Sequence, residues 1–410
     1  MTLIKPFSAL RPKPEFAKDV VAPPYDVLSS EEARIKVKGR PYSFLHISKP
    51  EIDLPEGTDP FDPEVYRTGA DNLKKLINAE ILLRDEDAHY YVYRLIMNGH
   101  RQTGLVAVAS VADYDSNRIR KHEFTRPDKE DDRVRQIDAL NAQTGPVFLT
   151  YRHEKRMDEI IDEICSAEPV YDLTADDGVQ HTIWRVDFAQ QIDSITSLFD
   201  NMTCLYIADG HHRSAAASRV AAERNRLKAK DSMSNYFLSV IFPDNQMNIL
   251  DYNRVIKDLN GLSHNELLTK IAESFSVSKS STAVKPGKAM EFGMYLDGQW
   301  YKLNTKEECI PHNDPVARLD VSLLQNLLIK PILGISDPRR DKRIDFVGGI
   351  RGLAELEKRV NNGYMAVAFS LYPTSMQALM SVADANEVMP PKSTWFEPKL
   401  ADGLLSHLLD

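Results

Sequence analysis

The middle of the chain contains a segment that joins a strand to a helix with almost no connecting loop. The apolar run Met202–Ala208 is typical of a buried strand, and the alanine-rich run Ser214–Ala222 strongly favours a helix. Only Asp209-Gly-His-His-Arg213 stands between them. Gly210 permits the unusual backbone dihedral angles that so abrupt a change of direction requires. The segment therefore predicts a strand-turn-helix unit whose junction residues lie at the N-terminus of the helix.

This junction has the chemistry of an anion site. The first backbone N–H groups of a helix lack partners within the helix and carry the positive end of its dipole. His211, His212 and Arg213 add hydrogen-bond donors at the same place, so phosphate is the expected ligand. Asp209, at the end of the strand, is suited to hold a Mg²⁺ ion that also binds phosphate oxygens. The alternative is structural: the histidines cap the helix and Asp209 is its N-cap.

A zinc site made by His211 and His212 is disfavoured. Adjacent residues on a helix point in different directions, and no cysteine lies near them in the sequence. Four versatile side chains packed around one glycine nevertheless favour a functional site over a capping arrangement. The predicted phosphate-binding residues are Asp209, Gly210, His211, His212 and Arg213.

A second polar cluster spans Lys121–Arg133. Pro127 and the acidic residues after it are typical of the first turn of a helix, and His122 and Glu123 precede that helix directly. Glu123 is well placed to act as a general base on a hydroxyl group. The alternative is a charged helix start that is simply solvated. The basic residues expected to meet a second anionic group are Arg126, Lys129 and Arg133.

Two segments of the C-terminal half, Ser336–Arg351 and Met389–Lys399, combine backbone freedom with basic and hydroxyl groups. Each is able to contact a phosphate or a nucleotide, or merely to turn the chain. Neither is a Walker loop, and no Gly-x-Gly-x-x-Gly pattern follows a strand. The candidate substrate-binding residues in them are Gly348, Gly349, Lys392, Ser393 and Thr394.

The bulk properties limit the class of protein. No apolar run approaches the ~18 residues that a membrane helix needs, and the N-terminus has no export signal, so we expect a soluble, cytoplasmic protein without a membrane partner. A net charge of -9 argues against a general nucleic-acid-binding face. Three widely spaced cysteines fit neither a disulfide framework nor a zinc motif.

The expected elements mix helices and strands, which predicts an α+β (mixed α/β) class. Asn98-Gly99 separates strands expected over 89–97 and 102–112, which is a strong hairpin signal. Since single cores stop growing at about 250–300 residues, a chain of 410 residues predicts several regions. We expect α+β regions at 1–112 and 263–410 around a catalytic core at 113–262, with the C-terminal region completing the site.

Six short motifs together resemble domain-of-unknown-function family 1015, and the resemblance runs from end to end. The motifs are Pro6-Phe with Leu10-Arg11, Val21-Ala-Pro-Pro-Tyr-Asp-Val27, His122-Glu-Phe-Thr125, Ala208-Asp-Gly-His-His-Arg213, Phe346-Val-Gly-Gly349, and Met389-Pro-Pro-Lys-Ser-Thr394 with Pro398-Lys399.

That family in turn resembles the ParB-like free-serine kinases, in which a His-Glu pair supplies the catalytic glutamate and an Asp-Gly-His-His-Arg segment binds nucleotide phosphates and metal. The resemblance implies a ParB-like core, with Glu123 as the base, His122 as its neighbour, and the segment from Asp209 to Arg213 as the phosphate site. It also implies Mg²⁺, ATP or ADP as co-substrate, and L-serine or O-phosphoserine as the other substrate, in either direction of transfer. Two alternatives stay open: a ParB-like nucleotide-binding regulator associated with DNA, and a phosphatase that needs no nucleotide.

Overall fold

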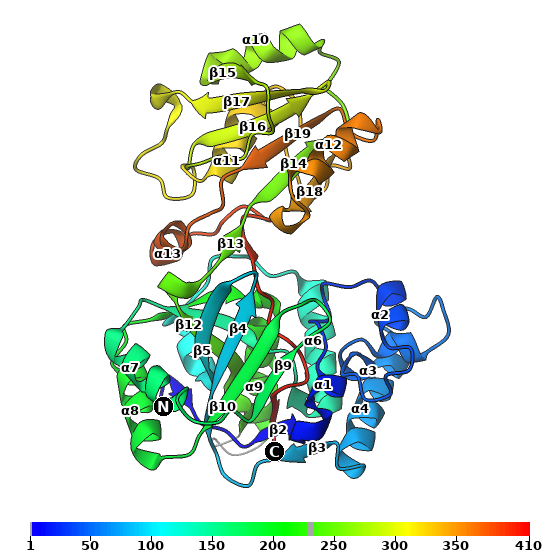
Figure 1. Cartoon of the computed structure of the whole chain (residues 1–410), viewed down its shortest axis with the longest axis vertical. Coiled ribbons are helices and arrows are strands. Elements are labelled where there is room, and N and C mark those ends of the chain that lie inside the picture. Colours follow the sequence, from blue (N-terminus) through cyan, green and yellow to red (C-terminus); the bar gives the residue numbers. More distant parts are fainter. Residues whose placement is uncertain (1, 228–232) are drawn as a thin grey trace. The chain divides into compact units, whose positions relative to one another are not determined.

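The computed structural model describes residues 2–227 and 233–410, and the chain forms two compact units (Figure 1). The first unit contains Met1–Met247 and Pro398–Asp410, and the second contains Asn248–Glu397. This division differs from the three predicted regions: the boundary at 112/113 falls inside the short helix α5 (Val111–Asp115), and the boundary at 262/263 falls inside the second unit. The predicted boundaries followed changes in local composition, which mark loops rather than the limits of a packed core.

A nine-stranded mixed sheet forms the centre of the first unit. Its strand order is β6-β11-β8-β12-β5-β4-β10-β9, and β1 pairs with β5. Most neighbours are antiparallel, but β11 pairs with β6 and β12 pairs with β8 in parallel. The strands are β1 (Ile4–Lys5), β4 (Tyr90–Met97), β5 (His100–Ser110), β6 (Ile119–Arg120), β8 (Val147–Tyr151), β9 (Tyr171–Thr174), β10 (Gln180–Val186), β11 (Leu205–Asp209) and β12 (Tyr236–Pro243).

The predicted hairpin is confirmed as β4 and β5. Asn98 and Gly99 both have positive φ, 51° and 80°, as a tight two-residue hairpin turn requires. The helices predicted at Pro127 and after Asp209 are also confirmed, as α6 and α9. The α-helices of this unit besides α5 are α1 (Ala17–Val20), α2 (Ser30–Lys36), α3 (Leu45–Ser48), α4 (Pro63–Asn78), α6 (Pro127–Leu140), α7 (Lys155–Ile164), α8 (Ala189–Asp200) and α9 (His211–Leu227).

Large apolar clusters stabilise the first unit, and two of them join its helices to its sheets. One joins the main sheet to α7, α8 and α9, and it includes Ile161, Phe199 and Ala217. The other lies among the N-terminal helices, where Phe44 and Leu73 are buried, and reaches a small sheet. That sheet has the order β3-β2-β21-β7. Its strands are β2 (Ala9–Pro12), β3 (Leu82–Arg84), β7 (Ala142–Gln143) and β21 (Ser406–Leu408), so residues near both ends of the chain share one sheet.

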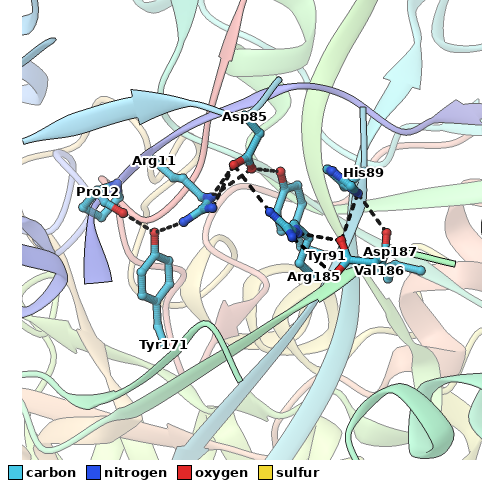
Figure 2. A network of polar contacts seen from close by, with 9 residues as sticks. All are labelled: Arg11, Pro12, Asp85, His89, Tyr91, Tyr171, Arg185, Val186 and Asp187. Atoms are coloured by element: carbon cyan, nitrogen blue, oxygen red, sulfur yellow. Dashed lines mark hydrogen bonds and ion pairs between the residues drawn. The ribbon is translucent and has the colours of Figure 1, made fainter. Parts of the chain in front are cut away.

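A network of polar contacts fastens the N-terminal segment to the main sheet (Figure 2). The guanidinium Nε of Arg11 donates to both carboxylate oxygens of Asp85 at 2.9 Å, and the hydroxyl of Tyr91 donates to Asp85 at 2.5 Å. Arg11 also donates to the hydroxyl of Tyr171 at 3.2 Å. Burial by itself would raise the pKa of Asp85, but these hydrogen bonds outweigh it and lower that pKa, so the carboxylate stays charged. The charges of Arg11 and Asp85 are therefore paired with each other.

The second unit is built on an antiparallel six-stranded sheet with the order β15-β17-β16-β19-β14-β18. Its helix α11 is a short α-helix that continues as the π-helix Gln325–Ile329. The elements are β13 (Ile249–Leu250), β14 (Tyr252–Ile256), α10 (His264–Ser274), β15 (Phe275–Ser280), β16 (Glu291–Leu296), β17 (Gln299–Thr305), α11 (Asp320–Leu324), β18 (Ile344–Gly348), α12 (Leu353–Asn361), β19 (Val367–Leu371), α13 (Met376–Asp384) and β20 (Trp395–Phe396).

The α+β class is confirmed by these sheets and helices. Within the described residues, no helix has the length and apolar character needed to cross a bilayer.

Candidate functional site

Two parallel strands bring the His-Glu segment and the Asp-Gly-His-His-Arg segment together. β6 pairs with the first residues of β11, which places Arg120 opposite Tyr206. Because parallel strands run in the same direction, the residues that follow them emerge at the same end of the sheet. His122 and His211 therefore come into contact, although they are 89 residues apart in the sequence.

The junction between β11 and α9 has the predicted geometry. β11 ends at Asp209, α9 begins at His211, and Gly210 between them has a φ of +95°. The pairing of β11 with β8 shifts register at this point, so a β-bulge turns the end of the strand. A Cβ atom on Gly210 would lie 3.1 Å from Nε of Arg213 and 3.4 Å from Cα of Val147. Glycine is therefore the residue that this junction requires.

His122, Glu123 and His211 form a compact cluster. One potential ligand atom from each lies within 4.8 Å of the other two. The two imidazole rings meet edge to face with their centroids 4.5 Å apart, and the backbone N–H of His122 donates to Nε2 of His211 at 3.4 Å. Burial lowers the pKa of His122 to about 4 and lowers the pKa of His211 well below its ordinary value, so both rings are neutral at pH 7. Glu123 is exposed at the mouth of this cluster.

Asp209 is paired with a lysine from the last segment of the chain. Nζ of Lys399 lies 3.1 Å from Oδ2 of Asp209, and the backbone N–H of Gly210 donates to Oδ1 at 2.8 Å. The guanidinium of Arg213 lies 4.0 Å from the same carboxylate. Burial by itself would raise the pKa of Asp209, but the charges of Lys399 and Arg213 outweigh it and hold that pKa well below its ordinary value. Magnesium at Asp209 stays a prediction, and it requires Lys399 to release the carboxylate.

Behind the junction lies a cavity of about 30 Å³ that Tyr25, Arg133, Arg213 and Asp402 help to line. It is large enough for a water molecule or two. Arg213 donates to the carbonyl of Pro146, and Arg133 lies over the ring of Tyr25 at 3.9 Å. Burial raises the pKa of Asp402 to about 7, although the neighbouring charge of Arg213 lowers it. Neither Asp402 nor Lys399 was predicted as a site residue, although Lys399 ends the segment Met389–Lys399 that was expected to contact a phosphate.

The three basic residues that were predicted to meet a second anionic group each have a different neighbour. Arg126 is exposed and its guanidinium lies 2.7 Å from the carboxylate of Asp128. Nζ of Lys129 lies 5.6 Å from the centre of the Phe61 ring. Arg133 instead lies against the cavity, 2.6 Å from Asp132. Lys129 and Arg133 lie one turn apart on α6, but their side chains contact different aromatic rings, those of Phe61 and Tyr25.

His212 holds the loop that precedes α6. Its Nε2 accepts a hydrogen bond from the backbone N–H of Arg126 at 3.1 Å. The ring is half-buried, and this burial lowers the pKa of His212. The two adjacent histidines thus have different neighbours, as their positions on a helix predict.

The C-terminal candidates belong to the second unit, where they have structural contacts of their own. A Cβ atom on Gly349 would lie 2.2 Å from Oδ1 of Asp251, so only glycine fits there. A Cβ atom on Gly348 would lie 3.1 Å from the ring of Trp395, which is a tight but less severe contact. The carbonyl of Lys392 accepts from Arg254 at 2.9 Å, and the hydroxyl of Ser393 donates to the carbonyl of Pro390 at 2.6 Å, with Thr394 next in the chain. Their predicted role in substrate binding stays a prediction.

The solved structures that resemble this chain, all at low similarity, include three of different description. A free serine kinase in complex with AMP is 13% identical over 71% of this chain and 86% of that chain, with a TM-score of 0.35. SbnI with a C-terminal truncation, from Staphylococcus aureus, is 12% identical over 74% and 87%, with a TM-score of 0.38. A conserved hypothetical protein from Pyrococcus furiosus is 15% identical over 73% and 94%, with a TM-score of 0.35. Similarity of this size carries no inference about the activity of this chain.

The sequence comparisons are more specific. Among curated proteins, none has a sequence that matches this chain. A family described as "Protein of unknown function (DUF1015)" matches residues 4–322. Because the match covers most of the chain, and includes both the His122-Glu123 and the Asp209-to-Arg213 segments, the protein belongs to the DUF1015 family.

Proposed function

We propose that this protein transfers a phosphoryl group between an adenine nucleotide and L-serine or O-phosphoserine. The observation that carries the proposal is the position of Glu123, whose carboxylate lies within 4.8 Å of a ring nitrogen of His211 at the start of α9. A general base must lie close to the phosphate that its hydroxyl attacks. A carboxylate beside a helix N-terminus meets that requirement.

Each part of the site has a role in this reaction. The N–H groups at the start of α9, with His212 and Arg213, would bind the phosphate oxygens and stabilise the charge that develops on them. Lys399, held beside the junction by Asp209, adds a further positive charge. Phosphoryl transfer depends mainly on such positioning and charge neutralisation, because it needs little covalent chemistry from the protein.

In the kinase direction, the serine hydroxyl gives its proton to Glu123 while its oxygen forms a bond to the terminal phosphorus of the nucleotide. The bond from that phosphorus to the bridging oxygen breaks, and the bridging oxygen leaves with the electron pair. In the reverse direction, phosphoserine donates its phosphoryl group to a nucleotide phosphate, and Glu123 returns the proton to the serine oxygen. Magnesium enters with the nucleotide, as part of that substrate, and supplies neutralisation of phosphate charge.

The identity of the substrates rests on the resemblance of the His-Glu and Asp-Gly-His-His-Arg motifs to those of free-serine kinases. In those kinases the His-Glu pair supplies the catalytic glutamate, and the Asp-Gly-His-His-Arg segment binds nucleotide phosphates and metal. The experiment below decides whether ATP or ADP is used, and in which direction the phosphoryl group moves.

The test is to incubate the protein with Mg²⁺, each adenine nucleotide, and serine or phosphoserine in turn, and to follow the phosphorus species by ³¹P NMR. We expect phosphoserine to form from serine and a nucleotide, or to be consumed as a nucleotide gains phosphate. Phosphate release from phosphoserine without any nucleotide would replace the transferase by a phosphatase. No change in any mixture would refute the proposal, and salt-sensitive binding to duplex DNA would then favour the regulator.

A further inference from the structure

The cluster of His122, Glu123 and His211 offers more than a base beside a phosphate. The proposed transfer reaction assigns no role to the His122 side chain. His122 is nevertheless only 2% exposed and packs against His211, which is 5% exposed. We propose that His122, Glu123 and His211 form a binding site for one divalent transition-metal ion of the Zn²⁺ and Co²⁺ type. This site is separate from the magnesium that enters with a nucleotide.

The spacing of the three side chains suits such an ion. Their potential ligand atoms lie within 4.8 Å of one another. Ligands at ~2.0–2.1 Å from a tetrahedral Zn²⁺ ion are separated from each other by about 3.3 Å. A shift of about 1.5 Å therefore closes the cluster around an ion. Glu123 is exposed and lies in the loop between β6 and α6 rather than in a helix or strand, so we expect Glu123 to make that shift.

The hydrogen bonding of the two rings leaves them available as ligands. Nδ1 of His122 is buried and has no hydrogen-bond partner, the one histidine nitrogen in that condition among residues 2–227 and 233–410. Buried polar atoms normally have a partner, and an unpaired one calls for an explanation such as a missing ion. Nε2 of His211 accepts only a long hydrogen bond of 3.4 Å from the backbone. Metal coordination would satisfy ring nitrogens that the protein alone leaves poorly paired.

The donor set decides which ion is expected. Two imidazole nitrogens and one carboxylate are ligands that Zn²⁺ and Co²⁺ prefer, whereas Mg²⁺ prefers oxygen ligands and retains its water molecules. Three protein ligands leave a fourth position for water or a substrate oxygen, and the exposure of Glu123 opens that position to solvent. Coordination would also use a lone pair of Glu123, so an ion bound here would oppose the role of Glu123 as a base.

The experiment is a titration of the full-length protein with Co²⁺, without nucleotide or serine, followed by visible absorption and by calorimetry. We expect one site, with the visible bands of an imidazole-bound Co²⁺ ion, and displacement by Zn²⁺ but not by a large excess of Mg²⁺. His122→Ala, His211→Ala and Glu123→Ala should each weaken binding by at least about tenfold. His100→Ala is the control, because it removes a histidine of the same unit that lies at the start of β5 and outside the cluster, and it should leave Co²⁺ affinity unchanged.

Unchanged Co²⁺ affinity in Glu123→Ala would overturn the proposal, as would displacement by Mg²⁺ or a larger loss in His100→Ala than in His211→Ala. The Glu123 variant keeps the test valid if the variants of the buried histidines fail to fold, since Glu123 is exposed. Because binding is measured without the substrates of transfer, absence of phosphoryl transfer in the ³¹P assay has no bearing on this result.

Discussion

Replacement of Gly210 by alanine tests the strand-helix junction on which the candidate site depends. A φ of +95° lies in a region that residues with a Cβ atom rarely adopt, and holding alanine there costs about 1–2 kcal/mol. The new Cβ would also lie 3.1 Å from Nε and 3.2 Å from Cζ of Arg213, so the guanidinium must move by a few tenths of an ångström. Together these effects should lower the free energy of unfolding by about 1–3 kcal/mol.

The displacement of Arg213 gives Gly210→Ala a second, functional consequence. Arg213 donates to the carbonyl of Pro146 and lies 4.0 Å from Asp209, so its movement should disturb the charge that faces the proposed phosphate. We expect weaker binding of ADP or inorganic phosphate, measured by calorimetry, together with the loss of stability, measured by urea denaturation.

Gly178→Ala is the matched control in the same unit. Gly178 has a similar φ of +82°, but no atom lies within 4 Å of its added Cβ. It should therefore show the backbone cost of about 1–2 kcal/mol without any change in phosphate binding. If Gly210→Ala bound phosphate as well as Gly178→Ala does, the junction would not be the anion site. Wild-type stability in Gly210→Ala would refute the strain argument itself.

Three further changes test other parts of the structure. Glu123→Gln should lower kcat for phosphoryl transfer by about 10²–10⁴-fold, because it removes the base. Nucleotide affinity should stay nearly constant, because the side chain keeps its shape. Full activity would exclude Glu123 as the base. Asp402→Asn should stabilise the protein increasingly between pH 4 and pH 7, by up to roughly 4 kcal/mol, and should have no effect below pH 4. Burial raises the pKa of Asp402 to about 7, so between pH 4 and pH 7 its carboxyl group keeps a proton in the folded protein that the unfolded chain has already lost. The stability that this proton provides is complete below pH 4 and is lost as pH rises to 7. A pH-independent difference in urea denaturation would contradict this. Asp85→Ala leaves Arg11 without its carboxylate partner and should cost about 3–5 kcal/mol, whereas the double variant with Arg11→Ala should recover part of that loss; a cost under about 1 kcal/mol would show that the pair is solvated.

Short sequence patterns correctly predicted the strand-helix junction at Gly210 and the hairpin at Asn98-Gly99, because neighbouring residues determine both. The strand, glycine and helix around Gly210 were readable because apolar content, a flexible residue and alanine-rich helix propensity follow one another without interruption. The hairpin at Asn98-Gly99 was readable for the same reason. The hairpin of β16 and β17 was missed although Asp297-Gly298, with φ values of 48° and 75°, is an equally good signal.

The remainder of the candidate site depends on pairings that sequence patterns do not contain. β6 is only Ile119–Arg120, too short to have a periodicity, yet its pairing with β11 brings His122 to His211. Lys399 reaches Asp209 across 190 positions of sequence. The different contacts of Lys129 and Arg133 have a similar cause. Helix geometry gives the position of each residue on the helix but not the residues that its side chain contacts.

The last segment of the chain, Pro398–Asp410, sets the order in which the protein can be completed during synthesis. It carries Lys399 and Asp402 and supplies β21, the strand that lies between β2 and β7. The ribosome makes these residues only after the whole second unit, so β2 and β7 wait for their shared partner while that unit, Asn248–Glu397, is translated. A nascent chain that lacks this segment has neither the partner of Asp209 nor a closed small sheet. The Lys399–Asp209 pair and the small sheet therefore form only after the second unit has been translated.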